Sequence, residues 1–332
     1  MLRLVQFYES DGQRRVGIAG DDPQVLQLVD GYTSVYDMAL AAIRSTTPLE
    51  QFARAHATDR IADYERLIVE RRVLPPLDHP DPARCIVSLP ALPRLGGAQA
   101  RDKMHGGVAA GPASDSIRMF QIGVAGGKPA PGRIGAQPEW AYKGDGRCIV
   151  APEHPLFQPA YADDGGEEAE IAGLYLIGDD GTPWRVGDAL GNEFADHVLE
   201  RQNYLYLAHS KLRQCSFGPE LLVGALPPVL NGRVLIRRGD QVIWQSAFDT
   251  GEANMSHAIA NLEHHHFKYD LFRRPGDLHV HFFGANGVSF GAGVQPHDGD
   301  IFEIELPLFG RPLRNPLQVD PGPAPLVTVR VL

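Results

Sequence analysis

The sequence has few cysteines and no long apolar run, and both shortages narrow the class of protein. Its 332 residues include three cysteines, Cys85, Cys148 and Cys215, which are odd in number and widely spaced. A disulfide framework is therefore not expected, and a reducing compartment fits this cysteine usage better. No run approaches the roughly 18 apolar residues of a membrane-spanning helix, and the first residues alternate like a strand instead of forming an apolar signal region. We expect a cytoplasmic protein without a membrane partner.

Positive charge is also scarce. The chain has 31 Lys and Arg residues against 41 Asp and Glu, which gives a formal net charge of -10. A nucleic-acid partner requires a positive face and is therefore not expected. A small anionic substrate is compatible with this balance if a bound cation supplies local positive charge. The glycine motifs GxGxxG and GxxxxGK[ST] are absent as well, so nothing in the sequence supports a nucleotide-binding fold.

A proline-rich stretch divides the chain into a small N-terminal module, residues 1–78, and a larger body, residues 79–332. Four prolines fall within residues 74–82. Proline can continue neither a helix nor a central strand, so this stretch is typical of a semi-rigid linker.

The N-terminal module contains hairpin and helix signals. Asp11-Gly12 between two alternating runs predicts a hairpin, and Ser34 before an apolar periodic segment predicts a helix N-cap. Two further short helices are expected over residues 48–57 and 61–69.

The body is dominated by β-like apolar runs separated by Gly-Asp or Asp-Gly turns. These runs cover residues 84–89, 171–178, 232–239, 277–284 and 301–306. Helices are expected over residues 196–212 and 256–271. Because strands and helices do not alternate as βαβ units, we predict a β-rich α+β fold.

A Glu-Ala-Glu segment before an apolar run is the strongest candidate for a chemical site. If the run is a strand, Glu168 and Glu170 point to the same face, because side chains alternate along a strand. Two such carboxylates repel each other unless a cation lies between them, and hard oxygen ligands suit Mg²⁺, Mn²⁺ or Ca²⁺. A solvated acidic turn is the alternative interpretation. Residues 187–203 could bring a third carboxylate to the pair.

Several motifs follow this segment in a recognisable order: a Gly before an Asn-Glu pair and a helix, then a Lys, a Gly-Pro pair and a series of glycine turns. They are Glu168–Glu170, Gly187–Glu193, Lys211, Gly218–Pro219, Arg274–Asp277, residues 283–287, Gly299-Asp300 and residues 310–315. This order, over roughly residues 80–320, resembles the fumarylacetoacetate hydrolase superfamily. Residues 138–144 and 262–268 are similar to its sugar-acid branch, whose members act on 2-keto-3-deoxy sugar acids.

The resemblance implies a mixed β-roll catalytic domain after the small N-terminal module, and a homodimer. It also implies a divalent cation, Mg²⁺ or Mn²⁺, held by Glu168, Glu170 and Glu193. The third ligand is usually Asp in the family, so Asp196 is an alternative to Glu193.

The resemblance implies further site residues. Lys211 matches the active-site lysine of the family, and Lys143 matches a lysine that could meet the substrate carboxylate; surface charge is the alternative for both. Asn254 lies where the family shapes its substrate pocket, although a helix cap explains it equally well. The family's Thr-Gly-Thr turn is missing, and Asn286 is the candidate to replace its contact with the substrate.

One departure from the family favours a particular reaction. Its carbon–carbon hydrolases carry a His and a Glu that activate water, and residues 92–101 contain neither. His105 is the nearest histidine and the candidate catalytic base. Elimination of water needs no attacking water, so we predict a dehydratase that converts 2-keto-3-deoxy-D-pentonate to 2-oxoglutarate semialdehyde in non-phosphorylative sugar catabolism. The alternatives are a C–C hydrolase of a 2,4-diketo-3-deoxy sugar acid or acylpyruvate, and a catalytically silent binding protein.

Histidine clusters raise the question of a second metal site. Residues 264–266 are three consecutive histidines, which point about 100° apart on a helix and cannot converge on one ion. His279 and His281 share a face of a strand, and such pairs can bind metal. Because no third ligand is near them in sequence, core or interface roles are favoured for both.

Overall fold

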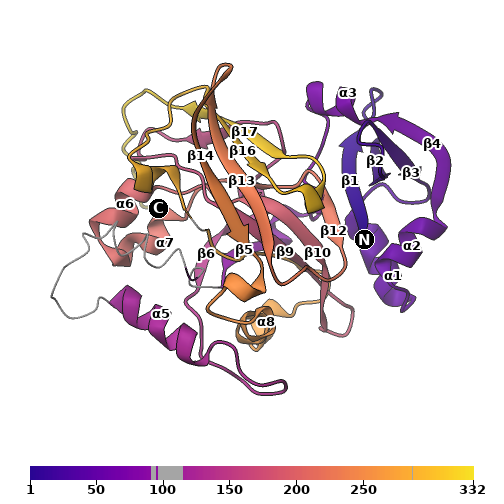
Figure 1. The fold of residues 1–332 in the computed structure, drawn as a ribbon, viewed down its shortest axis with the longest axis horizontal. Helices are drawn as coiled ribbons and strands as arrows, with labels where there is room; N and C mark the ends of the chain where they lie inside the picture. Colours follow the sequence, from indigo (N-terminus) through magenta and orange to yellow (C-terminus); the bar gives the residue numbers. More distant parts are fainter. Residues whose placement is uncertain (91–94, 96–114, 286) are drawn as a thin grey trace.

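The structure is a computed structural model, which describes residues 1–90, 95, 115–285 and 287–332. It contains a twelve-stranded sheet and a five-stranded sheet, with short helices around them (Figure 1). The strands of the first sheet are β1 (Leu2–Tyr8), β2 (Arg14–Ala19), β3 (Val25–Val29), β4 (Ala57–Asp63), β5 (Cys85–Leu89), β6 (Ala141–Asp145), β7 (Ile149–Val150), β9 (Ala169–Ile177), β10 (Pro183–Asn192), β11 (Cys215–Phe217), β12 (Leu221–Val223) and β15 (Leu278–Phe282). Those of the second are β8 (Leu156–Gln158), β13 (Leu230–Arg238), β14 (Gln241–Thr250), β16 (Ile301–Glu305) and β17 (Leu313–Val319). The helices are α1 (Val35–Arg44), α2 (Leu49–Ala55), α3 (Tyr64–Val69), α5 (Asp115–Gly126), α6 (His197–Gln202), α7 (Leu207–Ser210) and α8 (Ile259–Phe267).

The N-terminal strands continue the sheet of the body. The main path of the first sheet is β4-β3-β2-β1-β12-β10-β9-β15-β5-β6, and Leu2 of β1 pairs with Val223 of β12. The N-terminal module lies at one side of the molecule in Figure 1. Leu4 and Leu174 belong to one buried apolar cluster, so the two parts share a core. The division of the chain at residue 78 remains a prediction.

Strand β9 is covered on both faces. Leu174 and alternate neighbours pack with α1 on one face, while Ile171 and Tyr175 pack against the second sheet on the other face. Strands β13, β14, β16 and β17 lie over β9 and β10 in Figure 1. A strand covered on both faces becomes a nearly continuous apolar run, as the sequence shows here. The predicted β-rich α+β fold and the five predicted strand runs are confirmed.

Two predicted helices are wrong in part. The helix expected over residues 61–69 is shorter than predicted. Residues 61–63 belong to β4 instead, where Ala62 pairs with Leu26 of β3. The helix begins only at Tyr64, where the Asp63 side chain accepts the N–H of Arg66. The helix expected over 196–212 is interrupted between α6 and α7, where Asn203 has an extended backbone.

The other two predicted helices of residues 48–57 and 256–271 are present. The helix expected over 48–57 is α2, and that over 256–271 is reduced to α8 and a short turn at Asp270–Phe272. The three cysteines are free. Within the described ranges, no helix is long and apolar enough to cross a membrane.

Replacing Ser34 with Ala is expected to lower the free energy of unfolding by about 1 kcal/mol. Ser34 is the N-cap of α1, as predicted, and its hydroxyl accepts the N–H of Asp37 at 3.0 Å. Its loss removes the side-chain acceptor of the Asp37 N–H in the first turn of α1. Urea unfolding measures the change, and Ser45→Ala at the exposed other end of α1 is the control, expected to stay within about 0.5 kcal/mol. Equal effects of the two substitutions would contradict the capping role.

Candidate functional site

Three glutamates from two neighbouring strand ends converge. Glu168 precedes β9 and Glu170 lies in it, so the strand directs both side chains to one face. Glu193 follows the last residue of β10, which pairs with β9 so that Asn192 lies opposite Ala169. One carboxylate oxygen of each glutamate lies within 4.8 Å of the others. The geometry thus brings these three carboxylates together, and their role as metal ligands remains a prediction.

Hydrogen bonds to Asn192 join the two acidic segments. Its side-chain oxygen accepts the backbone N–H groups of Glu168 and Phe194, each at 3.2 Å. The N–H of Glu193 donates to the carbonyl of Glu168 at 3.0 Å. Phe194 has a φ of 41°, a left-handed conformation that is costly for a residue other than glycine. Backbone strain is therefore placed next to Glu193.

Lys211 lies between two of the carboxylates. Its Nζ pairs with Glu168 Oε1, and lies 2.8 Å from Glu193 Oε2 and 3.8 Å from Glu200 Oε2. Burial by itself would lower the pKa of Lys211, but the charges of these three glutamates outweigh burial and raise the pKa well above its usual value. Lys211 is therefore an ammonium ion at neutral pH, and it can donate a proton but not accept one.

Lys143 is buried behind Glu193. Its Nζ donates to Glu193 Oε1 at 2.5 Å, to the Phe194 carbonyl at 2.8 Å and to the Lys211 carbonyl at 3.1 Å. An ammonium group has three donors, and all three are used here. Lys143 thus positions Glu193 and the segment that carries Lys211. Its predicted contact with a substrate carboxylate would require one of these bonds to break.

The charge of Glu170 is balanced less completely by neighbouring cations than the charges of Glu168 and Glu193. Its Oε2 accepts the N–H of Gly284 at 2.7 Å. Burial, followed by repulsion from Glu168 and Glu193, raises the pKa of Glu170 well above its usual value, and Lys211 opposes this only in part. The cluster therefore has room, electrostatically, for a further positive charge beside Glu170.

His197 is a site residue that the sequence analysis missed. It is the first residue of α6, its Nε2 lies 3.0 Å from Glu168 Oε1, and its Nδ1 lies 3.4 Å from Asp164 Oδ2. Burial would lower the pKa of His197, but its contacts with the carboxylates of Asp164 and Glu168 outweigh burial and raise it to about 10. The histidine is therefore a second cation that orients Glu168. In the sequence, its position directly after Asp196, the N-cap of α6, was the signal that could have drawn attention to His197.

Asp196, the alternative third ligand, is engaged elsewhere. One carboxylate oxygen caps α6 by accepting the N–H of Leu199 at 2.9 Å, and the other pairs with Arg213 at 3.0 Å. Among the residues that the structure describes, the converging group contains Glu193 and not Asp196.

The other predicted site residues are not brought to this cluster by any described contact. The side-chain amide of Asn254 donates to the Thr250 carbonyl at 3.1 Å and so holds the turn after β14. His105 and Asn286 lie outside the described residues. The roles predicted for all three remain predictions.

Comparisons with known proteins place the fold. No protein-family model and no curated protein matches the sequence. A structure of 2-keto-3-deoxy-D-arabinonate dehydratase complexed with magnesium and 2,5-dioxopentanoate is similar, with a TM-score of 0.67 and 16% identity over 96% of this chain and 99% of that chain. A 2-hydroxyhepta-2,4-diene-1,7-dioate isomerase from Mycobacterium marinum gives a TM-score of 0.58 and 17% identity over 97% of this chain and 100% of that chain. The chain therefore has the fold that the resemblance implied.

Proposed function

We propose that the protein is a metal-dependent dehydratase of the fumarylacetoacetate hydrolase superfamily. Its substrate is a 2-keto-3-deoxy sugar acid, specifically 2-keto-3-deoxy-D-pentonate, and its product is 2-oxoglutarate semialdehyde. The observation that carries the proposal is the convergence of Glu168, Glu170 and Glu193 beside the ammonium of Lys211. The shared fold with a dehydratase that was solved with magnesium and 2,5-dioxopentanoate supports it. We also propose that the enzyme is a cytoplasmic homodimer.

The donor set fits a hard divalent cation. Three carboxylates supply the oxygen ligands that Mg²⁺ and Mn²⁺ prefer, and the raised pKa of Glu170 marks a buried carboxylate that lacks a full counter-charge. Such a cation would bind the 2-keto and carboxylate oxygens of the substrate and make the C3 proton more acidic.

The proposed reaction removes water without an oxidant or a second substrate. A base takes a proton from C3, the C4 hydroxyl gains a proton and leaves as water, and tautomerisation converts the C5 alcohol to the aldehyde. Lys211 is the proposed donor of the proton to the C4 hydroxyl, because its Nζ lies beside Glu168 and Glu193. Lys143 is a positioning residue for Glu193. His105 is the proposed base at C3.

The test uses purified protein stripped of metal with a chelator. With Mg²⁺ and 2-keto-3-deoxy-D-pentonate, we expect one aldehyde to form for each substrate molecule consumed, and no turnover while the chelator is present. A 2,4-diketo-3-deoxy sugar acid is tested in parallel. Release of pyruvate from that acid would indicate the C–C hydrolase instead, and stabilisation by ligand without turnover would indicate a binding protein. Either of these results contradicts the proposed dehydratase activity. Full activity without a divalent cation contradicts the proposed dependence on metal.

A further inference from the structure

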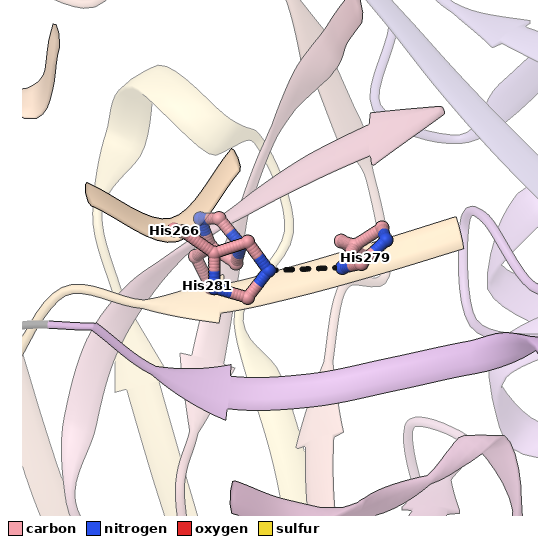
Figure 2. Close-up of side chains that lie close together, drawn as sticks. All are labelled: His266, His279 and His281. Carbon is pink, nitrogen blue, oxygen red and sulfur yellow. Dashed lines mark hydrogen bonds between the residues drawn. The ribbon is translucent and has the colours of Figure 1, made fainter. Parts of the chain in front are cut away.

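Three buried histidines from two elements meet on the other side of the first sheet. His279 and His281 lie on β15, and His266 lies in the last turn of α8. Their imidazole rings lie close together (Figure 2), and one ring nitrogen of each lies within 4.8 Å of the others. The sequence offers no third ligand close to His279 and His281, and in the structure His266 of α8 supplies the third imidazole.

This cluster is separate from the glutamates. Val280 packs in the core on the α1 side of the sheet, so its neighbours His279 and His281 face the opposite side, toward α8 and Phe267. Side chains alternate along β9, so Glu170 faces the same side as Ala172 and Leu174, which pack in the core with α1. The histidine cluster and the carboxylate cluster thus lie on opposite faces of the same sheet.

The cluster leaves polar atoms unpaired in an apolar surrounding. His266 Nε2 and His279 Nδ1 form one hydrogen bond of 3.1 Å. Both ring nitrogens of His281 and Nδ1 of His266 have no hydrogen-bond partner in the described part of the chain, although they are buried. An unpaired buried polar group costs about 1–3 kcal/mol, and apolar side chains would fill the space without that cost. Core packing alone does not account for three histidines here.

The surroundings of the rings suit metal binding. All three side chains are buried, and burial disfavours a charged imidazolium. A neutral imidazole offers a lone pair to a metal ion.

We propose that His266, His279 and His281 form a second metal site, for a borderline transition-metal ion such as Zn²⁺. Three imidazoles leave one position of a tetrahedral ion free for water or a ligand. With Zn–N bonds of about 2.0–2.1 Å the three nitrogens would be about 3.3 Å apart. The nitrogens lie within 4.8 Å of one another in the structure, so the rings would move closer together when the ion binds. This proposal does not depend on the proposed dehydratase activity.

A pocket lies beside one of the three histidines. His266 lines a hollow of about 550 Å³ together with Trp140, Tyr269 and Phe272. The ring of Phe272 stacks on that of His266, with centroids 4.3 Å apart. The proposed metal position is therefore adjacent to an aromatic pocket.

The experiment is a metal titration of the stripped full-length chain in millimolar Mg²⁺, which fills oxygen-ligand sites. We expect one Zn²⁺ per chain in competition with a chromophoric chelator, and a visible absorption band of imidazole-bound, low-coordinate Co²⁺. His281→Phe and His279→Gln should each weaken Zn²⁺ binding at least on the order of 100-fold, because loss of an outer-shell partner alone costs 10–100-fold. Thermal unfolding of each variant shows whether it is folded.

Two controls separate this site from its surroundings. His264→Gln removes the exposed histidine two residues from His266 and should leave Zn²⁺ binding unchanged. Glu170→Gln should also leave it unchanged, because the carboxylate cluster is on the other face. The proposal is overturned if the natural chain shows no Co²⁺ band, if folded His281→Phe or His279→Gln keeps full affinity, or if Glu170→Gln abolishes binding.

Discussion

Replacing Glu170 with Gln is expected to abolish the response of the protein to Mg²⁺ while stabilising the metal-free protein. In the metal-free protein this carboxylate is buried and repelled by Glu168 and Glu193, which raises its pKa. Gln keeps the shape and can still accept the N–H of Gly284, but it carries no charge. We expect the free energy of unfolding to rise on the order of 1 kcal/mol, the usual size of an effect of one substitution.

The same substitution removes a proposed ligand. Mg²⁺ at 100 times its dissociation constant should stabilise the natural protein by about 2.7 kcal/mol, and this gain should vanish in Glu170→Gln together with Mg²⁺-dependent turnover. Urea unfolding with and without Mg²⁺ measures both effects. Glu303→Gln is the control, since Glu303 is a buried carboxylate that pairs with Arg237 and Arg314 in the second sheet. It should destabilise the protein and leave the Mg²⁺ response intact.

A metal ligand is distinguished from a structural residue by two opposite effects of its substitution: the metal-free protein becomes more stable, and the stabilisation by Mg²⁺ is lost. A Glu170→Gln protein that is less stable without metal and still gains stability from Mg²⁺ would mean that Glu170 is only part of the scaffold. The ligand set proposed for the carboxylate cluster would then be wrong.

Replacing Asp188 with Asn is expected to remove a loss of stability that the natural protein suffers as pH rises. Asp188 lies in β10, opposite Gly173 of β9, and is buried. Neither of its carboxylate oxygens has a hydrogen-bond partner within the described ranges. Burial raises its pKa from 3.8 to about 7, against the attraction of Arg185. The ionised form is therefore disfavoured in the folded state.

The sign of the pH dependence follows from proton binding. Between pH 4 and pH 7 the folded chain keeps the proton of Asp188, whereas the unfolded chain has lost it, so stability falls as pH rises. The full loss, on the order of 4 kcal/mol for a shift of this size, is reached above pH 8. Asp188→Asn cannot ionise. Because about 1 kcal/mol of this loss has already occurred at pH 4.5, its stability relative to the natural protein should improve by about 3 kcal/mol between pH 4.5 and pH 8.

Urea unfolding at the two pH values measures this difference, and comparison between the pH values cancels any fixed packing cost of the Asn side chain. Asp300→Asn is the control. Burial alone would raise the pKa of Asp300, but its pairing with Arg238 lowers it below 3.8. Its effect should therefore be nearly constant above pH 4.5. A constant effect of Asp188→Asn over the same range would show that Asp188 is ionised in the folded protein.

Local signals in the sequence were sufficient for several elements. The Asp11-Gly12 hairpin and the Ser34 cap formed as predicted, and the strand run expected over residues 171–178 formed as Ala169–Ile177. Each depends on turn chemistry or on a period of two residues, which neighbouring residues specify on their own. The helix expected to begin at residue 61 begins at Tyr64 instead, because residues 61–63 pair with β3 as part of β4.

The sequence by itself determined that Glu168 and Glu170 share a face, because alternation along one strand is enough for that. Only the tertiary structure decided which distant groups reach them: Lys143 behind Glu193, and His197 against Glu168. The histidine cluster shows the same limit, since residues 279 and 281 acquire a third imidazole only when α8 packs on β15. Such contacts depend on strand order and helix packing between distant segments, which neighbouring residues do not encode.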